Sequence, residues 1–174
     1  QGNAKVRAAV KVYVGTEHGL DEYVRKVKAF NDIRNADDES HVVEVKMPWN
    51  LVVKDTITAV LYESRTEKLW VGTPTNLYRF DGKGWKSYES ELGNHRITAL
   101  VSQGASIWIG TEDGLFVYRG GQFEQKGKVL PSQKITALAW SEERKELFVG
   151  ADGAGIARLI PKKSENDKDR WSVF

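Results

Sequence analysis

The residues best suited to chemistry in this sequence are polar side chains that follow a recurring strand that ends in glycine. They stand two to four positions after the glycines at 15, 72, 110 and 150, and they are Glu17, His18, Thr75, Asn76, Glu112, Asp113 and Asp152. Carboxylates, an imidazole, a hydroxyl and an amide bind a polar ligand when a fold gathers them at one surface. Asn, Asp and Gly also favour tight turns, so turn formation competes as an explanation for each residue taken singly.

Catalysis and metal binding have weaker support. A pair of carboxylates for glycosidic chemistry could be assembled from Glu17, Glu112 and Asp113. The sequence has no Gly-x-Ser-x-Gly nucleophile elbow, and the glycine-rich residues 150–155 do not lead into a predicted helix that would cradle phosphate. The three histidines lie at no metal-ligand spacing, and cysteine is absent. We therefore predict no catalytic residues, no metal and no cofactor.

The elements that must position these residues are repeated strands. Four segments alternate aliphatic and aromatic residues and then reach glycine and a small residue: 12–16, 69–73, 107–111 and 147–151. A second marker, Ile-Thr-Ala, precedes three of them at 57–59, 97–99 and 135–137. From residue 57 onward both markers recur about every 40 residues, and the strands have an apolar period of two. This is typical of a β-propeller blade and not of a helical solenoid.

The predicted fold is all-β, with blades of four antiparallel strands in a single domain over residues 1–174. Three blades are complete, at about 55–90, 95–128 and 133–174. Their predicted strands are 57–61, 68–73, 76–80 and 85–88, then 97–101, 106–111, 115–119 and 122–125, then 135–140, 146–150, 155–160 and 170–174. The interblade loops 50–56, 89–96 and 128–134 are expected to join the polar turns on one face. The outer-strand aromatics Trp85, Phe123 and Trp171 are expected to pack against the next blade.

The first blade, at about 4–50, departs from the pattern. It has no Ile-Thr-Ala marker, so it is predicted to lack its inner strand, and residues 31–41 form a polar insert. Residues 20–25 are predicted as a strand, with a helix along 20–30 as the alternative, and residues 41–49 as the outer strand. Incomplete blades expose edges. The chain is therefore part of a larger propeller, a four-bladed ring, or a unit that associates with other copies through the incomplete blade.

Composition limits the class of protein. The 174 residues are 40% hydrophobic and 29% charged, which fits a globular protein with one core. A net charge of +2 with no long basic run argues against nucleic-acid binding. No apolar run approaches the ~20 residues of a membrane helix, and no signal peptide is expected at the N-terminus. The lack of cysteine is compatible with either cytoplasm or periplasm.

The repeats resemble the two-component regulator propeller family. The likeness is carried by Trp70-Val71-Gly72-Thr73 with Asn76-Leu77-Tyr78-Arg79-Phe80-Asp81, and by Trp108-Ile109-Gly110-Thr111 with Gly114-Leu115-Phe116-Val117-Tyr118. Departures are Asn76 for the family's glycine, Ala151 for its threonine, and residues 156–159 without an aromatic. The resemblance implies a sensory or binding module, periplasmic or extracellular, attached to a signalling protein.

Three functions remain open at this point. The first is a non-catalytic sensory or binding module whose ligand is a glycan or a protein. The second is a hydrolase or lyase acting on polysaccharide with acidic residues near the propeller axis. The third is a scaffold for protein–protein interaction. We predict the first of these, with the seven polar residues that follow the glycines as its binding surface.

Overall fold

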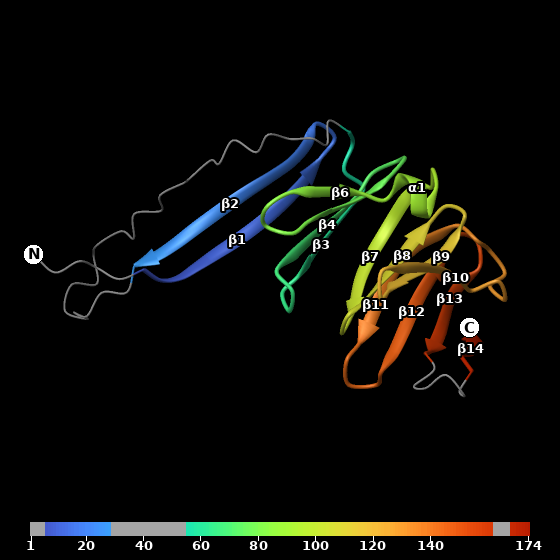
Figure 1. The fold of residues 1–174 in the computed structure, drawn as a ribbon. Coiled ribbons are helices and arrows are strands. Elements are labelled where there is room, and N and C mark those ends of the chain that lie inside the picture. The colour runs from blue at the N-terminus through green and yellow to red at the C-terminus, as the bar shows by residue number, and fades with distance from the viewer. Residues whose placement is uncertain (1–5, 29–54, 162–167) are drawn as a thin grey trace, which may run out of the picture.

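The structure, a computed structural model, describes residues 6–28, 55–161 and 168–174. Within these residues the chain forms three four-stranded antiparallel sheets and one two-stranded sheet (Figure 1). The fold is therefore all-β, with three complete propeller blades of four antiparallel strands and an incomplete first blade. Strands that follow one another in sequence are neighbours in each sheet, so every blade is a simple meander.

The strands of the complete blades begin and end within two residues of the predicted bounds. The first unit is the hairpin β1 (Val6–Thr16) and β2 (Gly19–Lys28). The second blade contains β3 (Ala59–Glu63), β4 (Lys68–Gly72), β5 (Leu77–Phe80) and β6 (Trp85–Ser87). The third contains β7 (Ile97–Gln103), β8 (Ser106–Thr111), β9 (Gly114–Arg119) and β10 (Gln122–Lys126). The fourth contains β11 (Ile135–Ser141), β12 (Glu146–Ala151), β13 (Gly155–Ile160) and β14 (Arg170–Val173).

One short helix lies where the sequence predicted only a loop. It is α1 (Glu89–Leu92), a four-residue turn between the second and third blades. Leu92 is buried in the cluster that joins these two blades, while the acidic residues of the helix face solvent. The helix is one turn long, too short for an apolar period to reveal it in the sequence.

The two repeated markers meet at each junction between units. A Cβ on Gly72 would lie 2.5 Å from Cγ2 of Ile97, which begins the inner strand of the next blade. The same holds for Gly110 and Ile135 at 2.7 Å, and for Gly15 with its next-blade isoleucine at 2.5 Å. Because real Cβ atoms do not approach this closely, the glycine is required so that the isoleucine methyl group can reach the sheet.

Main-chain hydrogen bonds strengthen two of these junctions. The N–H of Ile57 donates to the carbonyl of Thr16 at 3.0 Å, and the N–H of Ile97 donates to the carbonyl of Thr73 at 3.1 Å. Ile57 therefore bonds to the preceding unit instead of to β4. The inner strand of the second blade begins at Ala59, two residues after the predicted residue 57.

Alternate residues of one strand pack against different neighbours. On β8, Ile107 and Ile109 face the second blade, whereas Trp108 faces the fourth. All six residues of this strand are buried as a result. The cluster between the second and third blades contains Trp70, Leu77, Tyr88, Leu92, Ile97, Ile107 and Ile109. The cluster between the third and fourth contains Trp108, Leu115, Val117, Leu130, Ile135, Leu147, Val149, Ala151, Ala157 and Leu159.

The outer-strand aromatics pack in the direction opposite to the one predicted. The ring of Phe123 lies 5.3 Å from that of Tyr88 in the preceding blade. Trp171 packs against the cluster between the third and fourth blades, and Trp85 packs against the cluster that contains Leu20 of the first unit. The prediction that they pack on the next blade is wrong, because their register in the sheet places them on the backward face.

The first unit is a long hairpin. β2 pairs with β1 from Thr16 opposite Gly19 to Val6 opposite Lys28, so the alternative of a helix is wrong as far as residue 28. The predicted insert at 31–41 and outer strand at 41–49 lie outside the described residues. In Figure 1 the blue hairpin and the orange-to-red fourth blade lie at opposite ends of the stack, so these four units do not close a four-bladed ring.

The contact between glycine and isoleucine can be tested with Gly110→Ala. We expect this substitution to lower the free energy of unfolding by about 1–3 kcal/mol, the usual cost of overpacking, because the new methyl group would collide with Ile135. Denaturant titration followed by tryptophan fluorescence measures the loss. Gly150→Ala is the matched control, since its Cβ would approach no atom closer than 3.3 Å. Equal losses at both positions would contradict the explanation.

Candidate functional site

A threonine holds the turn that carries the predicted site residues in each of the first three repeats, and it is buried in the second and third. Thr111 Oγ1 donates to the carbonyl of Gly114 at 2.9 Å and accepts from the N–H of Asp113 at 3.1 Å. Thr16 and Thr73 make the corresponding bonds in the first two repeats. These bonds explain the threonine after the first three repeated glycines, whereas the fourth is followed by Ala151. They fix the backbone from which Glu112 and Asp113 project.

Each turn is bridged to the residues just before the inner strand of its own blade. Arg96 Nε lies 3.6 Å from Glu112 Oε1, and His95 Nδ1 lies 2.9 Å from Asp113 Oδ2. Lys134 Nζ lies 3.0 Å from Asp152 Oδ2 in the fourth blade. In the second blade the corresponding contact is a hydrogen bond and not an ion pair: the hydroxyl Oγ1 of Thr75 donates to Asp55 Oδ2 at 3.4 Å. We call these eight residues the loop rim: Asp55, Thr75, His95, Arg96, Glu112, Asp113, Lys134 and Asp152.

The loop rim is continuous between the third and fourth blades. The hydrogen bond and charge of Asp152 raise the pKa of Lys134 above its usual value, and the charge of Glu112 contributes as well. Positive and negative groups therefore alternate from Arg96 through Glu112 and Lys134 to Asp152, each about half-exposed. The fold brings three predicted residues, Glu112, Asp113 and Asp152, to one edge of neighbouring blades.

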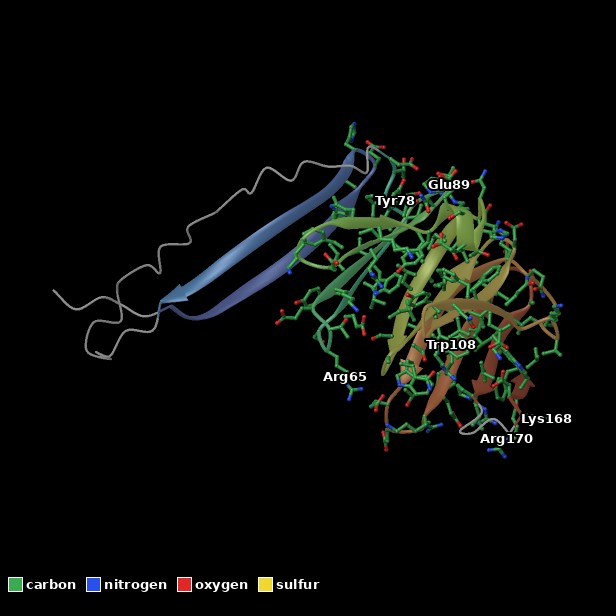
Figure 2. The ribbon with its side chains drawn as sticks, viewed as in Figure 1. Arg65, Tyr78, Glu89, Trp108, Lys168 and Arg170 are labelled. Carbon is green, nitrogen blue, oxygen red and sulfur yellow. The ribbon has the colours of Figure 1, made fainter. Side chains whose placement is uncertain are left out.

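Figure 2 shows the two ends of the second blade through the labelled residues Glu89 and Arg65. Glu89 begins the helix that leads toward the loop rim, and it lies at the end of the blade opposite to Arg65 in the β3–β4 turn. The turn of the first unit is joined to the rim side through the bond between Ile57 and Thr16. On that turn Glu17 and His18 are exposed and lie 3.6 Å apart.

Asn76 differs from the other predicted residues because it points into the blade. Its side chain is 4% exposed. Nδ2 donates to Ser87 Oγ at 2.8 Å, and Oδ1 accepts from the N–H of Leu77 at 2.7 Å. Both ends of the amide are thus bonded inside the second blade, which supports the explanation of turn formation for this residue.

Sequence reasoning missed the cations of the loop rim. Arg96 and Lys134 each stand directly before an Ile-Thr-Ala marker, and that shared position is the signal that could have found them. His95 also has a structural contact, since its ring lies 5.2 Å from that of Phe116. Within the described ranges no group of three or more His, Cys, Asp or Glu side chains could hold a metal ion.

A second polar cluster lies between the third and fourth blades, away from the loop rim. Lys126 Nζ contacts Glu124 at 2.6 Å and Asp169 at 3.0 Å, in a cleft that is also lined by Trp108 and Arg119. Burial alone would lower the pKa of Lys126, but the two carboxylates outweigh it and raise the pKa. Since the ammonium joins β10 to the segment before β14, we interpret this cluster as an interblade ion pair.

Comparisons with known proteins identify the fold and leave the family open. No protein-family model matches the chain, and no curated protein matches it in sequence. The resemblance to two-component regulator propellers therefore stays a prediction. Within the described parts of the chain, no helix is long and apolar enough to cross a membrane.

Several solved structures are similar in fold. One is the extracellular domain of a protein assigned as a one component system, BT4673, from B. thetaiotaomicron, with 16% identity, 93% of this chain and 21% of that chain covered, and a TM-score of 0.57. The computationally designed Ika8 protein shares 15% identity with this chain, with 91% of this chain and 48% of that chain covered and a TM-score of 0.51. A further structure of an extracellular domain of BT4673, described there as a hybrid two component system, shares 15% identity with this chain, with 96% of this chain and 28% of that chain covered and a TM-score of 0.50. This chain thus spans less than half the length of each.

The turn threonine gives a prediction for stability. Thr111→Val keeps the shape of the side chain but leaves the carbonyl of Gly114 and the N–H of Asp113 without their partner. We expect the free energy of unfolding to fall by about 1–3 kcal/mol, the cost of leaving buried polar groups unpaired. Thr75→Val is the control, because Thr75 is exposed. Denaturant titration of both variants tests this, and similar losses would contradict it.

The ion pair of the fourth blade gives a prediction for pH dependence. Asp152→Asn is expected to lower the pKa of Lys134 toward the ordinary lysine value, as measured by NMR titration of the lysine side chain. Because the pKa is raised in the folded state, the pair stabilises the fold below the ordinary lysine pKa and loses its effect as pH rises through the raised value. Glu143→Gln, on the β11–β12 turn, should leave the pKa of Lys134 unchanged. An unchanged value in Asp152→Asn would overturn this assignment.

Proposed function

We propose that this chain is part of a non-catalytic sensory propeller that acts outside the cytoplasm within a signalling protein. Two observations support the proposal: the repeats resemble two-component regulator propellers, and the same fold occurs in the extracellular domain of BT4673, which is described both as a one component and as a hybrid two component system. The identities of 16% and 15% make the second observation a likeness of fold alone. The location outside the cytoplasm rests on the same likeness.

The observation that carries the binding proposal is the alternation of charge along the loop rim. Arg96, Glu112, Lys134 and Asp152 follow one another across two blades and remain about half-exposed. The backbone of the turn that carries Glu112 is held by the bonds of Thr111, so little conformational entropy is lost at this turn when a ligand is bound. A polar or charged ligand, either a glycan or a protein segment, would meet both donors and acceptors there.

The rim carboxylates are proposed to accept hydrogen bonds and not to exchange protons. Glu112, Asp113 and Asp152 are each bridged to a basic side chain. Glycosidic cleavage uses two carboxylates that flank the scissile bond, whereas each of these carboxylates contacts a basic side chain. We therefore favour binding over a polysaccharide-active enzyme. Association of copies through the incomplete first blade stays a prediction, which sedimentation at increasing concentration tests.

The proposed function is tested by screening the full chain against immobilised polysaccharides and peptides. For any ligand found, the double variant Glu112→Gln and Asp113→Asn should bind at least about tenfold more weakly, because hydrogen bonds to charged groups contribute about 1.5–3 kcal/mol. Glu143→Gln is the control, since it is the same change on an exposed residue in the β11–β12 turn, away from the loop rim.

Two outcomes would contradict the proposal. Unchanged binding by the double variant would place the ligand elsewhere on the molecule. Cleavage of a polysaccharide, lost when Glu17, Glu112 and Asp152 are all replaced by Ala, would favour the enzyme instead.

A further inference from the structure

Of the four repeated glycines, one has no isoleucine packed against it. Gly15, Gly72 and Gly110 each receive an isoleucine from the next unit. Gly150 takes the same place on β12, but the atoms nearest to its Cβ position belong to its own blade: Thr136 Oγ1 at 3.3 Å and Ala137 Cβ at 3.4 Å. Among the described residues, no isoleucine therefore fills the space beside the Cβ position of Gly150, which we call the gap at Gly150.

The residues around Gly150 pair across their strands in the same way as residues of the second blade on the face that packs against the third blade. On β12 and β13, Gly150 stands opposite Ile156 and Phe148 opposite Arg158. On β4 and β5, Gly72 stands opposite Leu77 and Trp70 opposite Arg79. We call Phe148, Gly150, Ile156, Arg158 and Phe174 the end face.

The correspondence extends to the outer strand. The N–H of Phe174 donates to the carbonyl of Ile156 at 3.0 Å, just as the N–H of Tyr88 donates to Leu77 at 3.0 Å. The guanidinium of Arg158 lies 5.6 Å from the ring of Phe174, and that of Arg79 lies 5.7 Å from the ring of Tyr88. Phe174 is therefore the counterpart of Tyr88.

The two faces differ in what covers them. Leu77 is 0% exposed and Tyr88 is 1% exposed, because the third blade packs on both. Their counterparts Ile156 and Phe174 are 53% and 73% exposed. Side chains of this size are usually buried, and an exposed cluster of them marks an interaction surface.

We propose that the end face is a docking site for one further blade of the same repeat type. The isoleucine that begins the inner strand of this blade would fill the gap at Gly150. Its backward face would resemble that of the third blade, where Ile97, Ile107 and Ile109 pack on the second blade. An outer-strand aromatic would meet Phe174 as Phe123 meets Tyr88. This inference rests on the fold and does not depend on the proposed function.

A second copy of the described residues is a poorer occupant. Each Ile-Thr-Ala marker in this chain already has its isoleucine against a glycine: Ile57 on Gly15, Ile97 on Gly72 and Ile135 on Gly110. A second copy thus offers no free inner strand of the required kind within the described ranges. The occupant is a blade contributed by residues other than these.

The test adds such a blade and asks whether it docks. A copy of residues 89–126 is appended after Phe174, because in the chain these residues directly follow Tyr88, the counterpart of Phe174. We expect amide exchange to slow at least about tenfold in the appended inner strand and around Ile156. Should the direct fusion unfold the body of the protein, the same segment joined through a Gly/Ser linker gives the same comparison.

Gly150→Ala separates docking from general stability. In the unextended chain this change should have little effect, whereas in the extended chain it should abolish the added protection, because the methyl group occupies the space that the isoleucine needs. Replacing the appended isoleucine with Ala in the Gly150→Ala background should restore part of the protection.

Three results would overturn the inference. The appended segment could exchange as fast as an unfolded chain, or Gly150→Ala could leave its protection unchanged. The unextended chain could also form dimers that Phe174→Asp disrupts, which would make a second copy the occupant.

Discussion

The structure depends on one contact, the isoleucine methyl group that reaches the backbone of a glycine in the preceding unit. It occurs at Gly15, Gly72 and Gly110, and at each of them a Cβ would lie within 2.7 Å of the isoleucine. Burial of an isoleucine is worth about 1.5–3 kcal/mol, and here the full contact requires that the opposing residue has no side chain. The same close approach therefore recurs at each of the three junctions between the described units.

The same contact explains why the second strand of each blade reads as continuously apolar. Residues on one face of β8 pack against the second blade and those on the other face pack against the fourth, so neither face meets solvent. β12 has a neighbour on one face only, and its burial alternates from residue to residue. Burial therefore reports the position of a blade in the stack, although the sequences of β8 and β12 follow the same pattern.

Polar chemistry gathers where the packed strands end. The threonine that follows each of the first three glycines holds the turn, and in the three complete blades a residue just before the inner strand of the same blade bridges to the turn. The position of the loop rim follows from the stacking, because Arg96 and Lys134 each stand immediately before an isoleucine that packs against the glycine of the preceding blade. Asn76 lies on the same kind of turn but does not join the loop rim, because its side chain points into the blade and donates to Ser87.

The sequence by itself determined the number of complete blades and the bounds of their strands to within two residues, because these depend on local alternation and on markers about 40 residues apart. It also indicated which turns would carry acidic residues. Only the tertiary structure decided which way a side chain faces: Phe123 and Trp171 pack backward, Asn76 points inward, and Arg96 and Lys134 join the loop rim. The physical reason is that periodicity places a residue on one of two faces of a sheet, whereas the neighbour that covers that face comes from another part of the chain.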